Sequence, residues 1–235
     1  MSFSTSSAFD LRSPNPLPLL SAAVHVRLSD EDIDEFNAAS SVELRSTLDE
    51  AELSEIRTLH TEWFPVAYNE EFYSALTRND DQVLKVVACM RSCIVGLATV
   101  AVRRKERQYN PNEDLLPFLG LCNQTTNIAY ILTLGVVDEL RRKELGRSIL
   151  EKTLSEVEQG DPQCKVIMLH VITYNKNAMR LYTKLGFEQF KIEPNFFFYA
   201  DQWYDGILFY KRINQARERT RVSDWLQSKW RRVAR

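Results

Sequence analysis

Apolar residues recur along most of this chain at two spacings, one typical of helices and one of strands. From residue 53 to 63 they fall at three- and four-residue steps, as on one face of a helix. Largely apolar runs, such as 94–102 and 166–171, indicate strands that lie inside a sheet. The pattern predicts strands from residue 42 and over 83–89, 94–102, 128–137, 165–171, 187–192 and 206–213, and helices over 53–63, 71–78, 145–157 and 177–185. This order of elements predicts a mixed α/β fold with a central sheet.

The same pattern divides the chain into three parts. Residues 1–41 form an N-terminal extension that is rich in Ser, Pro and Leu at its start, and we expect it to be partly disordered. Residues 42–213 hold the strands and helices listed above and form one domain, in which a polar insertion at 103–127 separates two strands. Residues 214–235 predict a basic amphipathic helix.

A candidate binding site lies where the apolar run 130–137 breaks and a helix begins. The turn between them is basic and holds one glycine, Gly146. The first N–H groups of a helix have no partner inside it, and the helix dipole is positive at that end. Arginines add bidentate donors for phosphate oxygens. The segment therefore predicts a diphosphate site, and the alternative is a merely solvated turn.

A second segment follows about thirty residues later. The apolar strand 166–171 carries a single histidine, His170, and is followed by the pattern Asn-x-x-Ala-x-x-x-Tyr-x-x-x-Gly-Phe from Asn175 to Phe187. Gly186 in this pattern is suited to a left-handed residue at the end of a helix. On its own, a histidine in an apolar run is more often a hydrogen-bonded core residue than a catalyst.

Together the two segments resemble the signature of the GCN5-related N-acetyltransferase (GNAT) family. Arg141 matches the first position of Arg/Gln-x-x-Gly-x-Gly/Ala and Gly146 the last, whereas Glu144 stands where the family has its first glycine. The resemblance implies the GNAT fold, a mixed, mostly antiparallel sheet with two splayed strands (128–137 and 165–171) flanked by helices. It also implies acetyl-CoA as co-substrate. The Glu144 side chain should then either turn out to solvent or weaken cofactor binding.

Three further segments narrow the resemblance. Residues 63–68, 129–136 and 169–171 are similar to the N-terminal α-amino acetyltransferases of the NatF type, and next to those of the NatE type. The insertion at 103–127 and the aromatic segment 194–199 favour NatF. The resemblance covers about residues 42–214. It implies acetylation of peptide or protein N-termini that begin with Met followed by an apolar or amphipathic residue, and no nucleic-acid partner.

Two other functions stay open. One is an N-acetyltransferase acting on lysines of histone tails, a role also associated with NatF-like proteins. The other is a non-catalytic CoA-binding scaffold module, because Glu144 departs from the signature and phenylalanines stand where NatF-like enzymes have tyrosines.

The resemblance also assigns the catalytic residues. His170 would act as general base through an ordered water, and Tyr130 on the neighbouring strand would share this role; histidine titrates in the range needed to deprotonate an α-ammonium group. Tyr182 would contact the cofactor and protonate the leaving thiolate. Without the resemblance, both tyrosines are explained equally well as aromatic residues of the core.

The resemblance assigns two sets of binding residues. Backbone N–H groups near 132–134 would hold the amide arm of the cofactor and polarise its thioester carbonyl. The predicted cofactor-binding residues are Leu132, Thr133, Leu134, Arg141, Arg142, Lys143, Leu145, Gly146, Arg147, Asn175 and Tyr182. The predicted substrate-binding residues are Phe64, Pro65, Val66 and Tyr68 on one wall of a peptide slot and Phe196 and Phe197 on the other. The alternative is a hydrophobic loop that caps the core.

The composition argues against a membrane-spanning, a secreted or a metal-binding protein. At 235 residues, 44% hydrophobic and 26% charged, the chain has an ordinary globular composition. It holds no run near the ~20 apolar residues of a membrane span and no secretory leader pattern. Its four cysteines are scattered and it has three histidines, so we expect no metal site and reduced thiols in a cytosolic protein.

Charge is unevenly distributed. From residue 211 onward the chain carries nine of its 30 Lys and Arg and two of its 32 Asp and Glu, so this tail has a charge of +7 and the remainder −9. From 221 to 235, apolar residues that include Trp225 and Trp230 recur at helical spacing among cations. Such a helix suits an anionic membrane surface, and the alternative is packing on the acidic body. NatF-like enzymes bind membranes through C-terminal helices, which implies attachment to the cytosolic face of the Golgi or plasma membrane.

Overall fold

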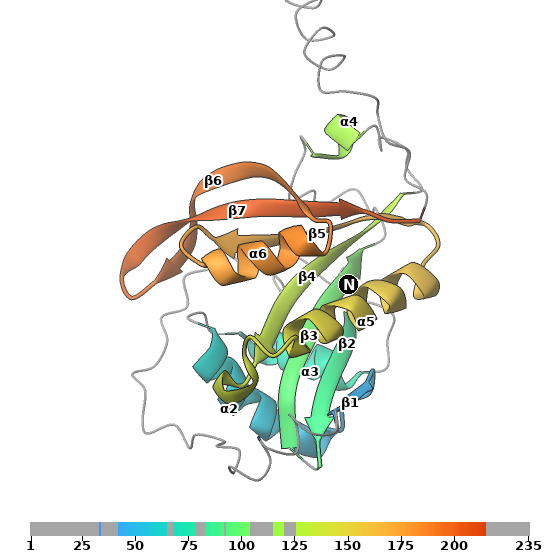
Figure 1. Cartoon of the computed structure of the whole chain (residues 1–235), viewed down its shortest axis with the longest axis vertical. Coiled ribbons are helices and arrows are strands. Elements are labelled where there is room, and N and C mark those ends of the chain that lie inside the picture. The colour runs from blue at the N-terminus through green and yellow to red at the C-terminus, as the bar shows by residue number, and fades with distance from the viewer. Residues whose placement is uncertain are drawn as a thin grey trace, which may run out of the picture.

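The computed structural model describes residues 33, 42–64, 68–78, 83–91, 93–103, 115–119 and 126–214. They form a seven-stranded sheet with helices on both faces (Figure 1). The strands are β1 (Val42–Arg45), β2 (Val83–Met90), β3 (Cys93–Arg103), β4 (Asn127–Val136), β5 (Cys164–Ile172), β6 (Glu188–Tyr199) and β7 (Gln202–Arg212). The helices are α2 (Leu53–Trp63), α3 (Glu70–Thr77), α4 (Leu115–Leu119), α5 (Leu145–Gly160) and α6 (Lys176–Lys184), with short 3-10 turns at Glu50–Glu52 and Asp138–Leu140.

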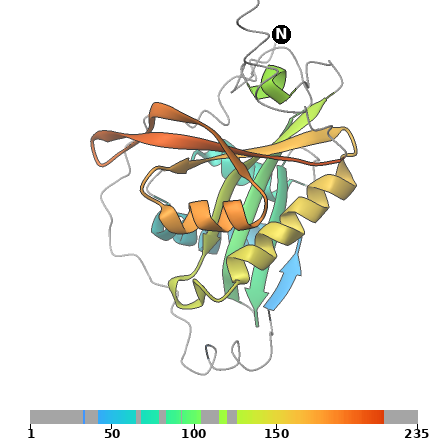
Figure 2. The same ribbon diagram turned by 45° about the horizontal axis from the view of Figure 1, so that its top comes forward.

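The order of strands in the sheet is β1-β2-β3-β4-β5-β7-β6. Every neighbouring pair is antiparallel except β4 and β5, which are parallel because α5 connects them as a crossover. This arrangement confirms the predicted mixed, mostly antiparallel sheet. Figure 2 shows α5 and α6 on one face of the sheet and α2 on the other. These two sides are called the α5 face and the α2 face.

Two glycines allow helices to approach the sheet closely. On the α2 face, a Cβ at Gly135 would stand 2.0 Å from the Trp63 ring, at the end of α2. On the α5 face, a Cβ at Gly96 would stand 2.5 Å from the side chain of Ile149. The glycine at 135 therefore lets the end of α2 lie directly on β4.

The parallel pair β4 and β5 separates partway along its length. Pairing runs from Asn127 with Cys164 to Tyr130 with Met168 and stops there, although β4 continues to Val136 and β5 to Ile172. Beyond this point β4 stays paired only with β3, and β5 only with β7. This confirms the predicted splay.

A bulge in β4 accompanies the splay. Its register with β3 passes from Ile131 opposite Val100 to Thr133 opposite Thr99, so Leu132 is the extra residue. A bulge bends its strand and raises the local twist. One edge of β4 after Tyr130 consequently faces the opening, while the other edge stays paired with β3.

The predicted end of one strand at residue 192 is wrong, because β6 continues to Tyr199. Pro194 is accommodated because β6 is the last strand of the sheet, where a proline costs no ladder hydrogen bond. The chain passes Pro194 as a bulge, with Asn195 at φ 52° and the register with β7 shifted between Glu193 and Phe197. The short helix α4 inside the insertion was not predicted either.

Several predicted features lie outside the described residues. They are most of the N-terminal extension, nearly all of the basic C-terminal segment, and Pro65 and Val66 of the peptide slot. Within the described part of the chain, no helix is long and apolar enough to cross a membrane, and no cluster of His, Cys, Asp and Glu could hold a metal ion.

Candidate active site

Tyr130 and His170, here called the catalytic pair, meet where β4 and β5 separate. Tyr130 is the last β4 residue in register with β5, opposite Met168, and His170 follows two residues later on the same face. The Tyr130 hydroxyl oxygen lies 2.6 Å from His170 Nδ1. The side chain of His170 is only 2% exposed. The structure therefore brings the two predicted catalytic residues into direct hydrogen-bond contact.

The other ring nitrogen of His170 faces a carboxylate that sequence reasoning missed. Glu193 Oε2 on β6 lies 3.4 Å from His170 Nε2, and Glu193 Oε1 lies 3.2 Å from Lys191 Nζ. Burial opposes ionisation of Glu193, but the hydrogen bond and charge of His170, with those of Lys191, lower the pKa of this carboxyl to about 2. Glu193 is therefore ionised at neutral pH.

The bulge in β6 aims an aromatic ring at the same histidine. Phe196 stacks on the His170 ring with centroids 3.8 Å apart, and Phe197 packs edge-on against Phe196. The Asn195 N–H donates to Asp205 Oδ1 over 3.0 Å, which holds the bulge. A Cβ at Gly206 would stand 2.9 Å from Phe196, so only a glycine at position 206 leaves room for the Phe196 ring. Both predicted residues of this wall thus lie beside the catalytic pair.

The opposite wall begins at the end of α2, on the same face of the sheet as the catalytic pair. The Phe64 N–H donates to the His60 carbonyl and ends the helix, and Tyr68 stacks on Phe72 with centroids 4.5 Å apart. Both Phe64 and Tyr68 are half-buried in this aromatic cluster.

His60 lies at the centre of that cluster. It is 1% exposed, and neither ring nitrogen has a hydrogen-bond partner among the described residues. Burial lowers the pKa of His60 to about 3, so the ring is neutral at physiological pH. The rings packed around it belong to Trp63, Phe64, Tyr68, Phe72 and Tyr73.

The basic turn before α5 forms a cradle of backbone N–H groups. The first helical bond of α5 runs from the Ser148 N–H to the Glu144 carbonyl, so the N–H groups of the three residues before Ser148 point out of the helix end. Arg142 and Glu144 lie in the left-handed region at φ 63° and 62°, which shapes the turn. This geometry fits a diphosphate, because converging N–H groups and a positive helix end are what such an anion needs.

Two arginines of the basic segment, Arg141 and Arg147, are already paired with carboxylates. Arg141 donates from Nε to the Val136 carbonyl over 3.0 Å and contacts Asp138 at 2.7 Å, which ties the turn to the end of β4. Arg147 lies 2.8 Å from Glu151 and 3.5 Å from Glu144. The Glu144 side chain is 70% exposed and so turns outward to solvent, beside the helix end. Of the other predicted residues here, Leu145 is buried, Gly146 and Lys143 are half-buried, and Arg142 is exposed.

Three other predicted cofactor residues have structural partners. Asn175 caps α6, where its side chain accepts from the Ala178 N–H over 3.1 Å. Thr133 is buried with its hydroxyl 2.7 Å from that of Thr99. Tyr182 is buried on α6, and burial raises the pKa of its hydroxyl, which therefore stays protonated. The half-buried residues Leu132 and Leu134 flank Thr133 along the open stretch of β4.

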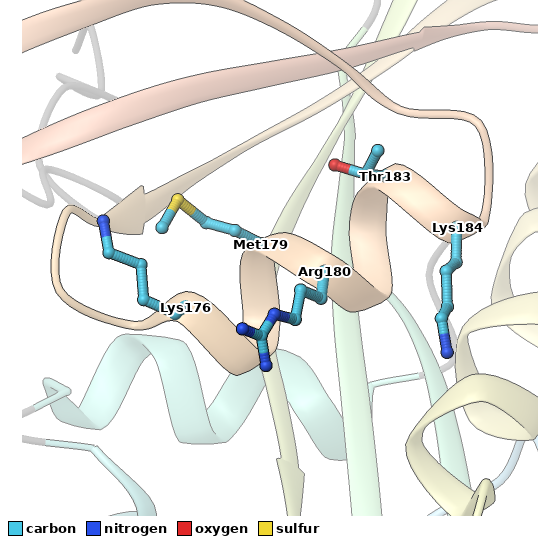
Figure 3. Close-up of a pocket in the computed structure, with 5 residues that line it drawn as sticks. All are labelled: Lys176, Met179, Arg180, Thr183 and Lys184. Atoms are coloured by element: carbon cyan, nitrogen blue, oxygen red, sulfur yellow. The ribbon is translucent and has the colours of Figure 1, made fainter.

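A pocket of about 400 Å³ lies along the exposed side of α6, and Figure 3 shows its lining. Leu181 of the same helix would be 3.8 Å from a Cβ at Gly146, so α6 adjoins the cradle. The lining cations recur every four residues along one helix face, a signal that was present in the sequence. The lining residues are Lys176, Met179, Arg180, Thr183 and Lys184.

The cradle and the aromatic walls lie on opposite sides of the sheet, and both lead to the catalytic pair. The cradle opens beside α5 and α6, whereas the aromatic walls and the catalytic pair lie toward the α2 face. The splay joins the two sides, because β4 and β5 are not bonded to each other beyond Tyr130. A donor held from one side and an amine entering from the other would meet at the catalytic pair.

Known proteins share this sequence and shape. The N-alpha-acetyltransferase 60 of Xenopus tropicalis is 28% identical over 179 residues, which cover 75% of this chain and 72% of that protein. The histone acetyltransferase MCC1 of Arabidopsis thaliana is 28% identical over 174 residues, covering 71% and 68%. The crystal structure of Arabidopsis thaliana NAA60 in complex with a bisubstrate analogue has a TM-score of 0.64 at 25% identity and covers 74% of this chain and 98% of that one.

The family itself is shown by a match over more than half of the chain. The model of the acetyltransferase (GNAT) family matches residues 53–187, from the start of α2 to the end of the Asn175–Phe187 motif. This span contains the splayed strands, the basic turn and both members of the catalytic pair. The chain belongs to the GNAT family of N-acetyltransferases.

Proposed function

We propose that this protein transfers the acetyl group of acetyl-CoA to the α-amino group of protein N-termini. The observation that carries the proposal is the 2.6 Å contact of Tyr130 with His170 at the point where β4 and β5 separate. Similarity to proteins named N-alpha-acetyltransferase 60, and to an NAA60 structure that holds a bisubstrate analogue, supports it.

The chain's residues suit direct attack in a ternary complex. Bound acetyl-CoA supplies the acyl thioester. The catalytic pair removes a proton from the entering α-ammonium group, and the freed nitrogen forms the new amide bond. Backbone N–H groups of residues 132–134 donate to the thioester oxygen as charge develops there. As the bond between the acyl carbon and sulfur breaks, Tyr182, which stays protonated, would give a proton to the sulfur and regain one from the second proton that the attacking nitrogen loses.

The aromatic walls favour an apolar or amphipathic start to the peptide. Phe64 and Tyr68 stand on one side, and Phe196 and Phe197 on the other. Relative to tyrosines, the two phenylalanines lack hydroxyls that could hydrogen-bond the peptide backbone, at a cost of about 0.5–1.5 kcal/mol per bond. The loss should weaken peptide binding more than it slows the chemistry.

A peptide panel tests the proposal. Peptides beginning Met-Leu, Met-Lys and Ser-Ala are incubated with acetyl-CoA, and mass spectrometry locates the acetyl group. We expect α-amine acetylation of the Met peptides. Acetylation of internal lysines only would contradict the proposal, and cofactor binding without any product would indicate a non-catalytic CoA-binding scaffold.

A second candidate is acetylation of lysines in histone tails. Similarity to a protein named histone acetyltransferase MCC1 favours it, and the charge of −9 on the chain before residue 211 would attract basic peptides. A histone tail peptide with a blocked N-terminus, added to the same panel, separates the two activities.

We also propose that the basic C-terminal segment attaches the protein to an anionic membrane surface on the cytosolic side of the Golgi or plasma membrane. The basis is the spacing of its tryptophans and cations. Binding to anionic but not neutral liposomes, lost on deletion of residues 214–235 and weakened by salt, is the expected result. Absence of a membrane fraction for both full-length and truncated protein in cells would contradict it.

A further inference from the structure

Glu193 completes a chain of three polar side chains. From β4 to β6 they run Tyr130 Oη, His170 Nδ1, His170 Nε2 and Glu193 Oε2, with separations of 2.6 Å and 3.4 Å across the two gaps. His170 and Glu193 are 2% and 12% exposed. A buried histidine between a hydroxyl and a carboxylate is the arrangement by which a carboxylate orients a catalytic base.

The carboxylate decides which nitrogen of His170 carries the proton. If Nδ1 carried it, the lone pair of Nε2 would face the negative charge of Glu193. With the proton on Nε2, the negative charge of Glu193 Oε2, 3.4 Å away, stabilises this side of the ring, and the lone pair of Nδ1 is left to accept from the Tyr130 hydroxyl. Only the second assignment agrees with both the charge of Glu193 and a hydrogen bond from Tyr130.

We propose that Glu193 is a positioning residue that fixes the proton of His170 on Nε2 and stabilises the ring when it becomes charged. The inference rests on the proposed function and deepens it. The α-ammonium group gives its proton to Tyr130 Oη, directly or through a water, while the proton of Tyr130 passes to His170 Nδ1. Tyr130 ends the step neutral, His170 carries one more proton, and Glu193 keeps its charge.

The fold places Glu193 for this role. The bulge after Glu193 turns the next aromatic, Phe196, onto one face of His170, where the stacked ring restricts tilting of the histidine. Lys191 engages Oε1 and leaves Oε2 for the histidine. The titratable or charged groups that face the ring include Tyr130 from β4, and Glu193 with its partner Lys191 from β6.

The coupling between Glu193 and His170 is reciprocal. Charged His170 lowers the pKa of Glu193, so charged Glu193 must raise the pKa of His170 by the same interaction. Removing the charge of Glu193 should therefore leave His170 a weaker base. This predicted change can be measured in the free protein, without substrate.

The test compares Glu193→Gln with Glu188→Gln. The first variant keeps the volume of the side chain and loses the charge beside His170. The second removes the charge of a β6 carboxylate that accepts a 2.8 Å hydrogen bond from Tyr210 and has no role in the proposed relay. The pKa of His170 is followed by NMR of ¹⁵N-labelled histidine, which is tractable because the chain has three histidines and His170→Asn identifies the signal.

We expect Glu193→Gln to lower the pKa of His170 and to reduce kcat about ten- to a hundredfold, as for other outer partners that orient a histidine. KM for the peptide and Kd for acetyl-CoA should change less than about twofold, since Glu193 is not placed to grip either. Glu188→Gln should leave the pKa of His170 and kcat at their wild-type values. An unchanged pKa, or an unchanged kcat, in Glu193→Gln would overturn the inference. If the unaltered protein acetylates no α-amine, the proposed function fails, and the titration alone then decides whether Glu193 controls His170.

Discussion

At the scale of single residues, the buried His60 makes the stability of the fold depend on pH. Its folded pKa of about 3 lies below the ordinary value of 6.5, so between these values the unfolded chain binds a proton that the folded chain does not. The stability of the fold is therefore unaffected by His60 above pH 6.5 and falls as the pH drops from 6.5 toward 3. At pH 5 the loss amounts to about 2 kcal/mol.

His60→Phe should remove this loss. Phenylalanine fits an aromatic cluster and has no buried nitrogen that lacks a partner. We expect the free energy of unfolding, measured in urea at pH 7.5 and at pH 5, to fall about 2 kcal/mol less in the variant than in the wild type. An equal fall in both proteins would mean that His60 is protonated in the folded state.

A substitution at Glu144 tests whether the turn before α5 binds the diphosphate of acetyl-CoA. Glu144→Gly removes a carboxylate from the anion-binding turn, and the repulsion between two charges about 4 Å apart in water is about 1 kcal/mol. We expect acetyl-CoA to bind several-fold more tightly by calorimetry. Glu151→Gln is the control, because Glu151 also pairs with Arg147 but lies a turn further along α5. An unchanged Kd in Glu144→Gly would show that Glu144 does not affect the cradle.

At the scale of elements, the contact of α2 with β4 sets one wall of the proposed peptide slot. Gly135→Ala would place a Cβ 2.0 Å from the Trp63 ring, so α2 must shift. Overpacking of this kind costs about 1–3 kcal/mol. We expect a lower Tm and a raised KM for the peptide, because Phe64 follows Trp63 directly. Gly160→Ala is the control, since a Cβ there meets nothing within 4 Å.

Elements were predictable where one periodic pattern defined them. The helices α2 and α5 follow from apolar spacing, and the observed α2 covers the same residues as predicted. The end of β6 was not predictable, because Pro194 breaks a strand everywhere except at a bulge or an edge. The five-residue helix α4 is too short to show a period.

The site was predictable only where a motif spans it locally. Tyr130 and His170 lie in segments with family signatures. Glu193 does not, and its place beside His170 depends on a bulge and on pairing between strands distant in sequence. Such a position becomes visible only when the register is known.

At the scale of the whole molecule, the proposed direct transfer depends on the splay of β4 and β5. The α5 face presents the cradle, the α2 face presents the aromatic walls, and the opening between β4 and β5 connects them. Loss of the catalytic pair should therefore stop transfer without affecting cofactor binding on the other side. None of the described cysteines belongs to the catalytic pair or the cradle, in keeping with transfer that needs no acyl-enzyme.

The most direct measurement compares the initial rate of acetylation of a Met-Leu peptide by the wild type, His170→Ala and Tyr130→Phe, with Kd for acetyl-CoA measured on the same samples. General-base catalysis is worth about 10²–10⁴ in rate, so we expect each variant to lose at least about a hundredfold in kcat. Kd should stay within about twofold of the wild type, because neither residue belongs to the cradle. Wild-type turnover by a correctly folded His170→Ala protein would contradict the account.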